Sequence, residues 1–304
     1  RPLDGAFGTP HTARFPFRER AARPGAAVAP LAVLARYGER PYLATMNWSL
    51  PFAYVGASLI GTLTAFAHFS RFCGEVGRAT ADVRTWAPLA VGQMKRLGVD
   101  SLPIALFLSA FTGIVMALQA SYTFTGAIPL YFVGALVGKT IILELGPVLT
   151  GLALSGRVGA NIAAELGTMR VSEQIDALET MAYNPVSYLV VPRVVAGIVM
   201  VPILVIFADV LGVAAGWITA MNVLDMSSAQ FVRGLRVFYD SFDIMYSIIK
   251  SISFGLVITV VGCYQGFNTR GGAEGVGVAT TRAVVISSVL ILVLDAFWAM
   301  VLLK

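Results

Sequence analysis

Residues 188–221 read YLVVPRVVAGIVMVPILVIFADVLGVAAGWITAM, and this stretch decides the class of fold. It is almost entirely apolar, and its only charged residues are Arg193 and Asp209. A transmembrane helix needs about 20 consecutive apolar residues, because the hydrocarbon core of a bilayer is about 30 Å thick. The stretch is therefore long enough to cross a membrane as a single helix.

Similar apolar runs occur on both sides of this stretch. They predict four further spans, at about 102–123, 129–153, 244–267 and 283–303. Pairs of small residues four positions apart, which let helix backbones approach closely, recur inside the spans at Gly134/Gly138, Gly212/Gly216 and Gly262/Gly266. The fold class that we predict is an all-α polytopic membrane protein with five transmembrane helices.

The composition excludes several other classes of protein. The chain has 304 residues, of which 57% are hydrophobic and only 13% are charged, whereas a soluble domain carries about 25% charged residues. A soluble enzyme, a disordered regulator and a small disulfide scaffold do not fit this balance. The two cysteines, Cys73 and Cys263, match no metal-binding or redox spacing.

Charge is distributed unevenly along the chain. Residues 1–100 hold 12 basic and 6 acidic residues, a net charge of +6, whereas residues 101–304 hold 10 and 11, a net charge of −1. This asymmetry indicates a basic region beside an anionic membrane surface rather than a nucleic-acid-binding protein.

The basic residues also predict the orientation of the spans. With five spans after residue 100, one side of the membrane receives eight basic residues and the other three. Because positive charge is retained in the cytoplasm, the loops 155–186 and 268–282 are expected there, and the C-terminus outside. The eight are Arg84, Lys95, Arg96, Arg157, Arg170, Arg193, Arg270 and Arg282, and the three are Arg233, Arg236 and Lys304.

The N-terminal part divides into two regions. Residues 1–49 are rich in Pro, Gly, Ala and Arg and read as an irregular basic extension. Residues 50–84 begin with an uncharged apolar run that is basic on both flanks. A helix lying in the membrane interface places both flanks on the cytoplasmic side, and we favour it over the alternative, a sixth span at 50–70.

The loop 155–186, SGRVGANIAAELGTMRVSEQIDALETMAYNPV, is too polar to lie in lipid. Ser172 is a candidate helix cap with acidic residues in the following turn, and Asn184 before Pro185 is expected to end the helix. Such a helix either floats at the headgroup boundary or docks into a separate cytoplasmic protein. One face is apolar and the opposite face polar: Val171, Ile175, Leu178 and Ala182 against Glu173, Asp176 and Thr180.

Several runs of the sequence resemble the MlaE/YrbE permease family. They are ELGP at 144–147, Gly156-Arg157, AAELGTMRVSEQIDAL at 163–178, Asn184-Pro185, Pro192-Arg193, Ile249-Lys250-Ser251, GGAEGVG at 271–277 and Thr280-Thr281-Arg282. Members of this family are membrane subunits of ABC-type lipid transporters that work with MCE-domain (mammalian cell entry) proteins, and a plant chloroplast lipid permease is among them. The resemblance covers residues 85–304.

The resemblance implies a fold, an assembly and a location. The fold would be one interfacial helix followed by five transmembrane helices. The segment 165–182 would be a coupling helix in a groove of a cytoplasmic ABC ATPase. The permease would form a homodimer capped outside by MCE-domain proteins. The membrane would be the bacterial inner membrane, or alternatively the chloroplast inner envelope. The candidate ATPase-coupling residues are Glu165, Arg170, Glu173, Asp176, Leu178 and Glu179.

The chain has no nucleotide-binding signature of its own. A P-loop reads GxxxxGK[ST], and no such run is present; the glycines at 271–277 instead predict a tight cytoplasmic turn. We therefore expect ATP and Mg²⁺ on the partner ATPase. We assign no catalytic residue, cofactor or metal to this chain.

Charged residues within the spans are costly in lipid and are candidates for function. Glu144, followed by a helix-interrupting Gly146-Pro147, and Lys250 are the main lipid-path candidates, because the matching residues of the family lie near the lipid pocket. Gln119 and Tyr122 are further candidates; Tyr122 belongs to an aromatic cluster that forms either the mouth of an apolar path or an aromatic belt. The remaining intramembrane charges are expected to snorkel (Lys139) or to support helix packing (Asp209 and Asp295).

The function that we predict is a permease subunit that moves phospholipids between the membrane and an MCE-protein conduit. The alternative is an ion-coupled secondary transporter or channel, which would favour relays of acids and an inverted repeat; no convincing repeat is present. A membrane-embedded enzyme would need a convergent nucleophile, base or metal set, and no His, Cys or Ser constellation offers one.

Overall fold

The computed structural model describes residues 49–123, 129–224 and 226–302. In this part of the chain every regular element is helical. The chain divides into two compact units, Arg1–Ile60 and Gly61–Lys304. The extension predicted at residues 1–49 lies outside the described residues, apart from Ser49 at the start of α2 (Ser49–Ala79).

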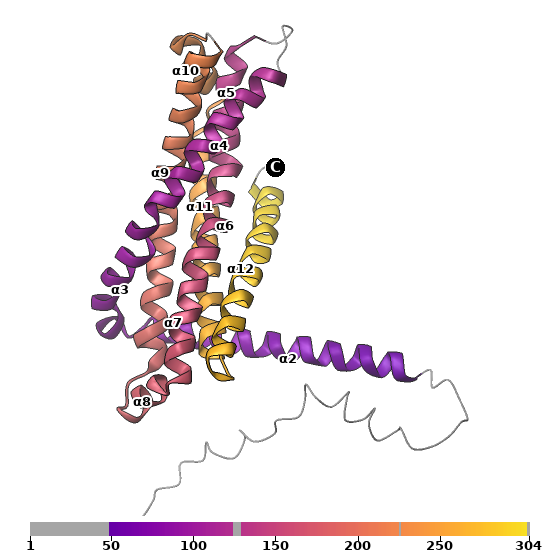
Figure 1. Ribbon diagram of the computed structural model, residues 1–304, viewed down its shortest axis with the longest axis vertical. Coiled ribbons are helices and arrows are strands. Elements are labelled where there is room, and N and C mark those ends of the chain that lie inside the picture. The colour runs from indigo at the N-terminus through magenta and orange to yellow at the C-terminus, as the bar shows by residue number, and fades with distance from the viewer. Residues whose placement is uncertain (1–48, 124–128, 225, 303–304) are drawn as a thin grey trace, which may run out of the picture. The chain divides into compact units, whose positions relative to one another are not determined.

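Five helical stretches within the described residues are long and apolar enough to cross a membrane (Figure 1), which confirms the predicted class. They are Val83–Thr123, Tyr131–Val171, Val186–Val223, Ser241–Phe267 and Gly272–Leu302. The first consists of α3 (Val83–Leu97), a short 3₁₀ turn and α4 (Leu102–Thr123). The second contains α5 (Tyr131–Thr140), α6 (Gly146–Leu154) and α7 (Ala160–Val171). The third consists of the π-helical turn Val186–Val190 and α9 (Val191–Val223). The fourth is α11 (Ser241–Phe267) and the fifth is α12 (Gly272–Leu302).

The second stretch contains two wide π-helical turns. The first, Ile141–Leu145, comes directly before Gly146 and Pro147, and the second is Ser155–Gly159. Proline has no backbone N–H to donate, and a π-helical turn relieves such a conflict by changing the hydrogen-bond register. Gly146-Pro147, predicted to break the helix, therefore only widens one turn, and the helix continues through it.

The small residues lie at contacts between helices. A methyl group on Gly113 of α4 would collide with the backbone carbonyl of Gly212 on α9. Gly134 lies likewise against the backbone of Phe231, and Gly266 against Leu166. The predicted role of the small-residue pairs in close helix packing is confirmed. Figure 1 shows the result: α4 and α11 pack along α9.

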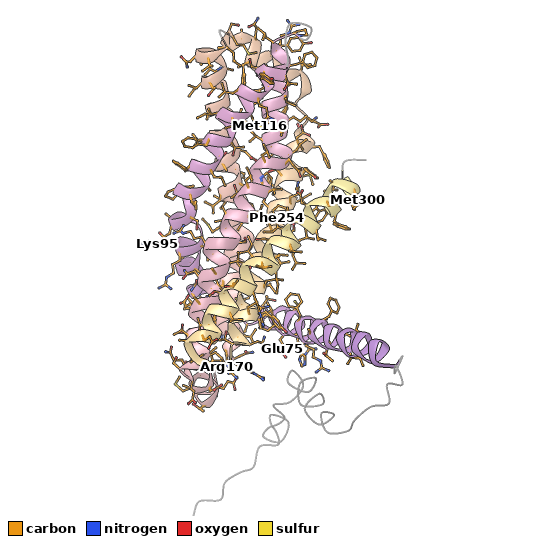
Figure 2. The ribbon with its side chains drawn as sticks, turned by 45° about the vertical axis from the view of Figure 1, so that its right-hand side comes forward. Glu75, Lys95, Met116, Arg170, Phe254 and Met300 are labelled. Carbon is orange, nitrogen blue, oxygen red and sulfur yellow. The ribbon has the colours of Figure 1, made fainter. Side chains whose placement is uncertain are left out.

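Most side chains in the interior of the unit 61–304 are apolar. Phe254 of α11 is fully buried in a cluster of Leu, Ile and Val side chains from α7, α9, α11 and α12. Figure 2 shows Phe254 within the bundle and Arg170 at one of its ends. Large apolar side chains such as Phe107 and Val289 remain exposed, as expected for helices whose outer surfaces contact lipid.

The part of α2 that belongs to this unit packs on the end of α11. Phe69 and Phe72 lie edge-on to Tyr264, with ring centroids 5.2 Å and 5.5 Å apart, and Phe72 also contacts Phe267. These aromatic contacts attach residues 61–79 to the bundle. The interfacial position of residues 50–70 remains a prediction.

Two short helices, α10 and α8, lie in the polar segments between the spans. α10 (Ser228–Phe238) lies between α9 and α11, and it begins with a capping box formed by Ser227 and Gln230. α8 (Gln174–Thr180) follows α7 after a turn. α10 is not predicted from the sequence, because residues 222–243, between two predicted spans, carry five charged residues and no long apolar run.

The predicted glycine turn at 271–277 is wrong in its extent. Gly271 and Gly272 have positive φ angles, which glycine adopts at little cost. The remaining glycines already belong to α12, which begins at Gly272. The last span is correspondingly longer than the predicted 283–303.

Candidate functional site

Lys250 of α11 is the centre of an ion cluster buried between the spans. None of its side chain is exposed. Its Nζ lies 2.8 Å from Oε2 of Glu144, donates a hydrogen bond of 3.1 Å to the carbonyl of Leu143, and forms an ion pair with Asp295 of α12. A lysine is tolerated at such a position only when nearby groups compensate for its lost hydration.

The local sequence explains this arrangement. In an α-helix the carbonyl of Leu143 would accept a hydrogen bond from residue 147, but Pro147 has no N–H to donate. The carbonyl is thus free for Lys250. The π-helical turn Ile141–Leu145 contains Glu144, so one irregular turn supplies two ligands to the lysine.

Aromatic side chains lie one turn away from the cluster. The Tyr246 ring centroid is 4.9 Å from Lys250 Nζ, and a cation over an aromatic face is attracted by the ring. Trp298, one turn after Asp295, donates a hydrogen bond of 3.0 Å to Ser253. The Tyr246 contact lies within α11, whereas the Trp298 hydrogen bond joins α12 to α11 beside the Lys250–Asp295 pair.

The cluster opens on one side. The side chain of Glu144 is 44% exposed, whereas that of Asp295 is 14% exposed. With all three groups ionised, two carboxylates face one ammonium and the cluster carries a net negative charge. Glu144 is therefore the partner of Lys250 through which the cluster reaches the protein surface.

The structure brings together only part of the predicted lipid path. Glu144 and Lys250 are in direct contact, and their place beside a lipid pocket remains a prediction. Gln119 and Tyr122 lie exposed in the last turns of α4, outside the cluster, and 84% of Tyr122 is accessible. Asp295, expected to support helix packing, is instead a direct partner of Lys250. Its one sequence signal, an acid within an apolar span, is shared with Asp209 and does not name its partner.

Two further intramembrane charges have partners of their own. Lys139 lies 3.5 Å from Asp243, so it makes an ion pair in addition to reaching the exposed surface. Asp209 accepts a hydrogen bond of 3.2 Å from Ser247 and packs against Gly146. Its expected role in helix packing agrees with these contacts.

Among the predicted coupling residues, Glu165 is engaged within the chain. Its carboxylate lies 3.1 Å from Arg193 of α9 and 3.4 Å from Arg96 of α3. Arg193 is almost completely buried. Glu165 therefore links α7 to two neighbouring helices.

The other predicted coupling residues lie around α8. Arg170 and Asp176 form an ion pair of 2.6 Å with both side chains partly exposed. Leu178 packs against the core together with the fully buried Ile175, as predicted, but Val171 and Ala182 of the predicted apolar face are exposed. Glu173 and Glu179 are exposed.

The predicted helix start at Ser172 is wrong. α7 continues to Val171, and the Ser172 hydroxyl donates back to the carbonyl of Thr168. The residue before α8 is Glu173, which has a φ of 59° and makes no side-chain cap. The segment 165–182 is thus two helices joined by a tight turn. Asn184 caps the following helix rather than ending α8, because its side chain accepts from the backbone N–H of Val186.

In the described part of the chain, no three His, Cys, Asp or Glu side chains lie close enough to hold a metal ion. Apolar spans, a charged cluster between them and a polar helical turn at one end define a class: a multi-pass membrane protein with a polar site inside its bundle.

The chain belongs to the MlaE permease family, whose sequence model, described as Permease MlaE, matches residues 90–301. A probable ABC transporter permease protein of Rickettsia bellii is 41% identical over 241 residues, which are 79% of this chain and 92% of the relative. The intermembrane phospholipid transport system permease protein MlaE of Haemophilus influenzae is 34% identical over 230 residues, or 75% of this chain and 87% of the relative. The chloroplastic protein TRIGALACTOSYLDIACYLGLYCEROL 1 of Arabidopsis thaliana is 36% identical over 203 residues, 67% of this chain and 58% of the relative. These relatives indicate a transporter subunit rather than an enzyme.

Proposed function

We propose that this chain is the membrane subunit of an ABC-type transporter that moves phospholipids, energised by a separate ATPase. Two findings support the proposal. One relative is named a probable ABC transporter permease, and another is named as part of an intermembrane phospholipid transport system. The observation that carries it is the fully buried Lys250, held between two carboxylates of which one, Glu144, is 44% exposed.

Lys250 is the proposed contact for lipid phosphate. A phospholipid needs an apolar path for its chains and a cation for its phosphate. If a phosphate oxygen replaces Glu144 at Nζ, Asp295 continues to neutralise the lysine, and Glu144 can turn toward its exposed side. Glu144 is thus the proposed exchangeable partner and Asp295 the permanent one.

The proposed assembly follows the family resemblance. The exposed acids around α8, with Asp176, are the docking surface for a cytoplasmic ATPase. Two copies of the permease and an MCE-domain protein complete the lipid path. We place the assembly in the bacterial inner membrane; ATP and Mg²⁺ belong to the ATPase.

Lipid transfer in proteoliposomes that contain the complete complex tests the lysine. Lys250→Met should reduce transfer at least about 10-fold, while Glu144→Gln has a milder effect. The loss reflects a missing phosphate contact, but it could also reflect instability, because breaking a buried ion pair costs about 3–5 kcal/mol.

Two further variants separate these explanations. Lys139→Met removes the cation of another intramembrane pair and should leave transfer near normal. The triple variant Glu144→Gln, Lys250→Met and Asp295→Asn leaves no charge of the cluster unpaired, so it should assemble normally yet fail to transfer lipid. Normal transfer by the triple variant would reduce the cluster to a structural role.

A further inference from the structure

Asp209 is a buried acid that the proposed lipid contact does not use. It lies within the apolar span α9, and only 9% of the residue is exposed. Its Oδ1 atom has no hydrogen-bond partner among the described residues. Because a carboxyl group inside a span is costly in free energy, the contacts of this side chain should indicate what it does.

One side of Asp209 contacts the helix that carries Lys250. Ser247 of α11 donates a hydrogen bond of 3.2 Å to Oδ2 of Asp209. Ser247 and Lys250 are both buried. They are three residues apart, so their side chains are neighbours on one surface of α11. Asp209 therefore fixes the contact between α9 and α11 one turn away from the lysine.

The other side of Asp209 contacts the turn that carries Glu144. Its Oδ1 lies against Gly146, so close that a methyl group there would collide with it. Gly146 directly follows the π-helical turn Ile141–Leu145, and its backbone N–H closes that turn by bonding to the carbonyl of Ile141. The carboxylate thus packs on the backbone two residues after Glu144.

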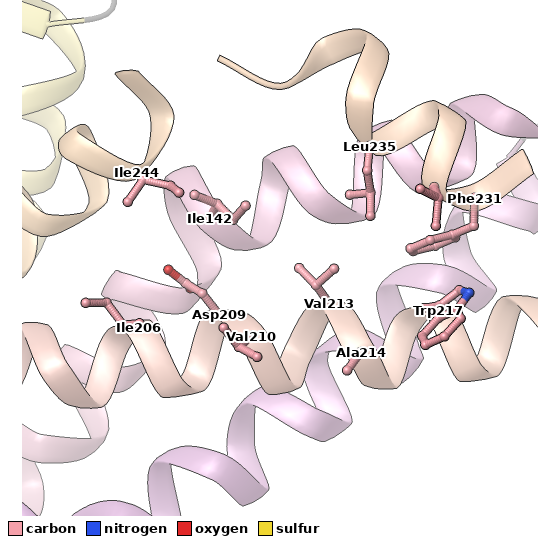
Figure 3. A pocket seen from close by; sticks show the side chains of 11 residues that line it. Ile142, Ile206, Asp209, Val210, Val213, Ala214, Trp217, Phe231, Leu235 and Ile244 are labelled. Atoms are coloured by element: carbon pink, nitrogen blue, oxygen red, sulfur yellow. The ribbon is translucent and has the colours of Figure 1, made fainter. Parts of the chain in front are cut away.

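α9 supports this turn at a second point. Gly212, about one helical turn after Asp209, faces the Ile141 side chain, which would lie 3.3 Å from a methyl group added at Gly212. Figure 3 shows Asp209 pointing from α9 toward Ile142 of the π-helical turn and Ile244 of α11, beside an apolar groove of about 420 Å³. α9 is therefore a common support for the turn and for α11.

We propose that Asp209 is a positioning residue, which holds the π-helical turn against α11 so that Glu144 reaches Lys250. Its two contacts lie within one turn of each partner of this ion pair. An apolar side chain in its place would remove the acceptor of the buried Ser247 hydroxyl, which is unfavourable. The consequence for transport rests on the proposed function of Lys250, whereas the positioning itself does not.

A double-mutant cycle on stability tests the positioning, because residues coupled through a backbone shift have non-additive effects. The full chain is purified in detergent, and its Tm is measured. Glu144→Ala should lower the Tm, since Lys250 loses a carboxylate and a charge-assisted hydrogen bond. In an Asp209→Ala background, where the turn is no longer held, the same change should lower the Tm by less than about half as much.

Two variants control for a general loss of packing. Thr219→Ala removes another buried polar group of α9, whose hydroxyl bonds to the Ala215 carbonyl of the same helix. Asp209→Asn keeps the volume of the side chain and the acceptor for Ser247. Both should leave the full effect of Glu144→Ala. An undiminished effect beside Asp209→Ala, or an equal reduction beside either control, would overturn the proposal.

Ser247→Ala gives a second cycle in case Asp209→Ala does not fold, because it removes the hydrogen bond and leaves the acid in place. It should also diminish the effect of Glu144→Ala, and an undiminished effect would again overturn the proposal.

Lipid transfer by the complete complex in proteoliposomes measures the consequence for transport. Asp209→Ala should reduce transfer severalfold, with no further loss in a Glu144→Ala background; a full additional loss there would contradict positioning through Glu144. Normal transfer by Lys250→Met would instead refute the proposed lipid contact. The stability cycle involves no lipid, so it would still decide whether Asp209 positions the pair.

Discussion

Two buried contacts of this chain form where a neighbouring residue lacks a group: a backbone N–H at Pro147 and side chains at Gly113 and Gly212. Lys250 finds a free carbonyl at Leu143 because Pro147 has no N–H. α4 and α9 meet closely because Gly113 and Gly212 have no side chains. In both places the missing group makes room for the contact. At Gly113 this can be tested by adding a methyl group.

Gly113→Ala restores one methyl group at the α4–α9 contact. The methyl would meet the carbonyl of Gly212, so the free energy of unfolding should fall by about 1–3 kcal/mol, the usual cost of overpacking. Gly92→Ala is the matched control, because nothing lies within 4 Å of the added atom. It should raise stability by up to about 1 kcal/mol, since Ala favours helix over Gly.

Thermal unfolding in detergent, followed by tryptophan fluorescence, compares the two variants. A Gly113→Ala protein as stable as Gly92→Ala would show that the helices separate without cost, contrary to the close packing described above.

At the scale of elements, the turn between α7 and α8 is the least regular part of the proposed docking surface. Glu173 occupies the left-handed region there, which is strained for residues other than glycine. Ile175 holds α8 against the core. Because Ile175 fixes α8, the exposed acids Glu173, Asp176 and Glu179 are held in defined positions, as a docking surface requires.

Glu173→Lys and Asp176→Lys should release the ATPase while the permease stays in the membrane, because each reverses a charge on this surface. Co-purification of the two proteins measures the effect. Asp176 also pairs with Arg170, so the double variant Arg170→Asp with Asp176→Arg is needed as a control: it keeps the pair but still reverses position 176. Full ATPase stoichiometry in all variants would show that α8 is not the docking element.

At the scale of the whole molecule, the orientation is set by charge. The end of the bundle that carries α7 and α8 holds most of the basic residues after residue 83, whereas α10 holds Arg233 and Arg236. Retention of positive charge predicts that α8 is cytoplasmic and α10 outside. The predicted external Lys304 lies outside the described residues.

Single cysteines at Ser172 and Ser228, in a chain lacking Cys73 and Cys263, test this orientation. Both positions are exposed. A membrane-impermeant thiol reagent should label Ser228→Cys on intact cells and Ser172→Cys only after permeabilisation. The opposite pattern would invert the topology and place α8 away from any cytoplasmic ATPase.

The sequence by itself determined the helical class, the five spans and the small-residue contacts. These depend on hydrophobic length and on spacing along one helix, both of which are local properties. The amphipathic pattern also identified the buried face of α8, where Ile175 and Leu178 pack.

Only the tertiary structure decided which charges meet. Asp295 is 45 residues from Lys250 in the sequence, and no local pattern distinguishes it from Asp209, which instead contacts Ser247. Likewise, α10 packs against α5, where Gly134 lies against Phe231 and Gly138 against Leu235, whereas in the sequence residues 222–243 are only a polar stretch between two predicted spans. Partner choice among buried charges depends on how whole helices pack, and this cannot be determined from the periodicity of any single helix.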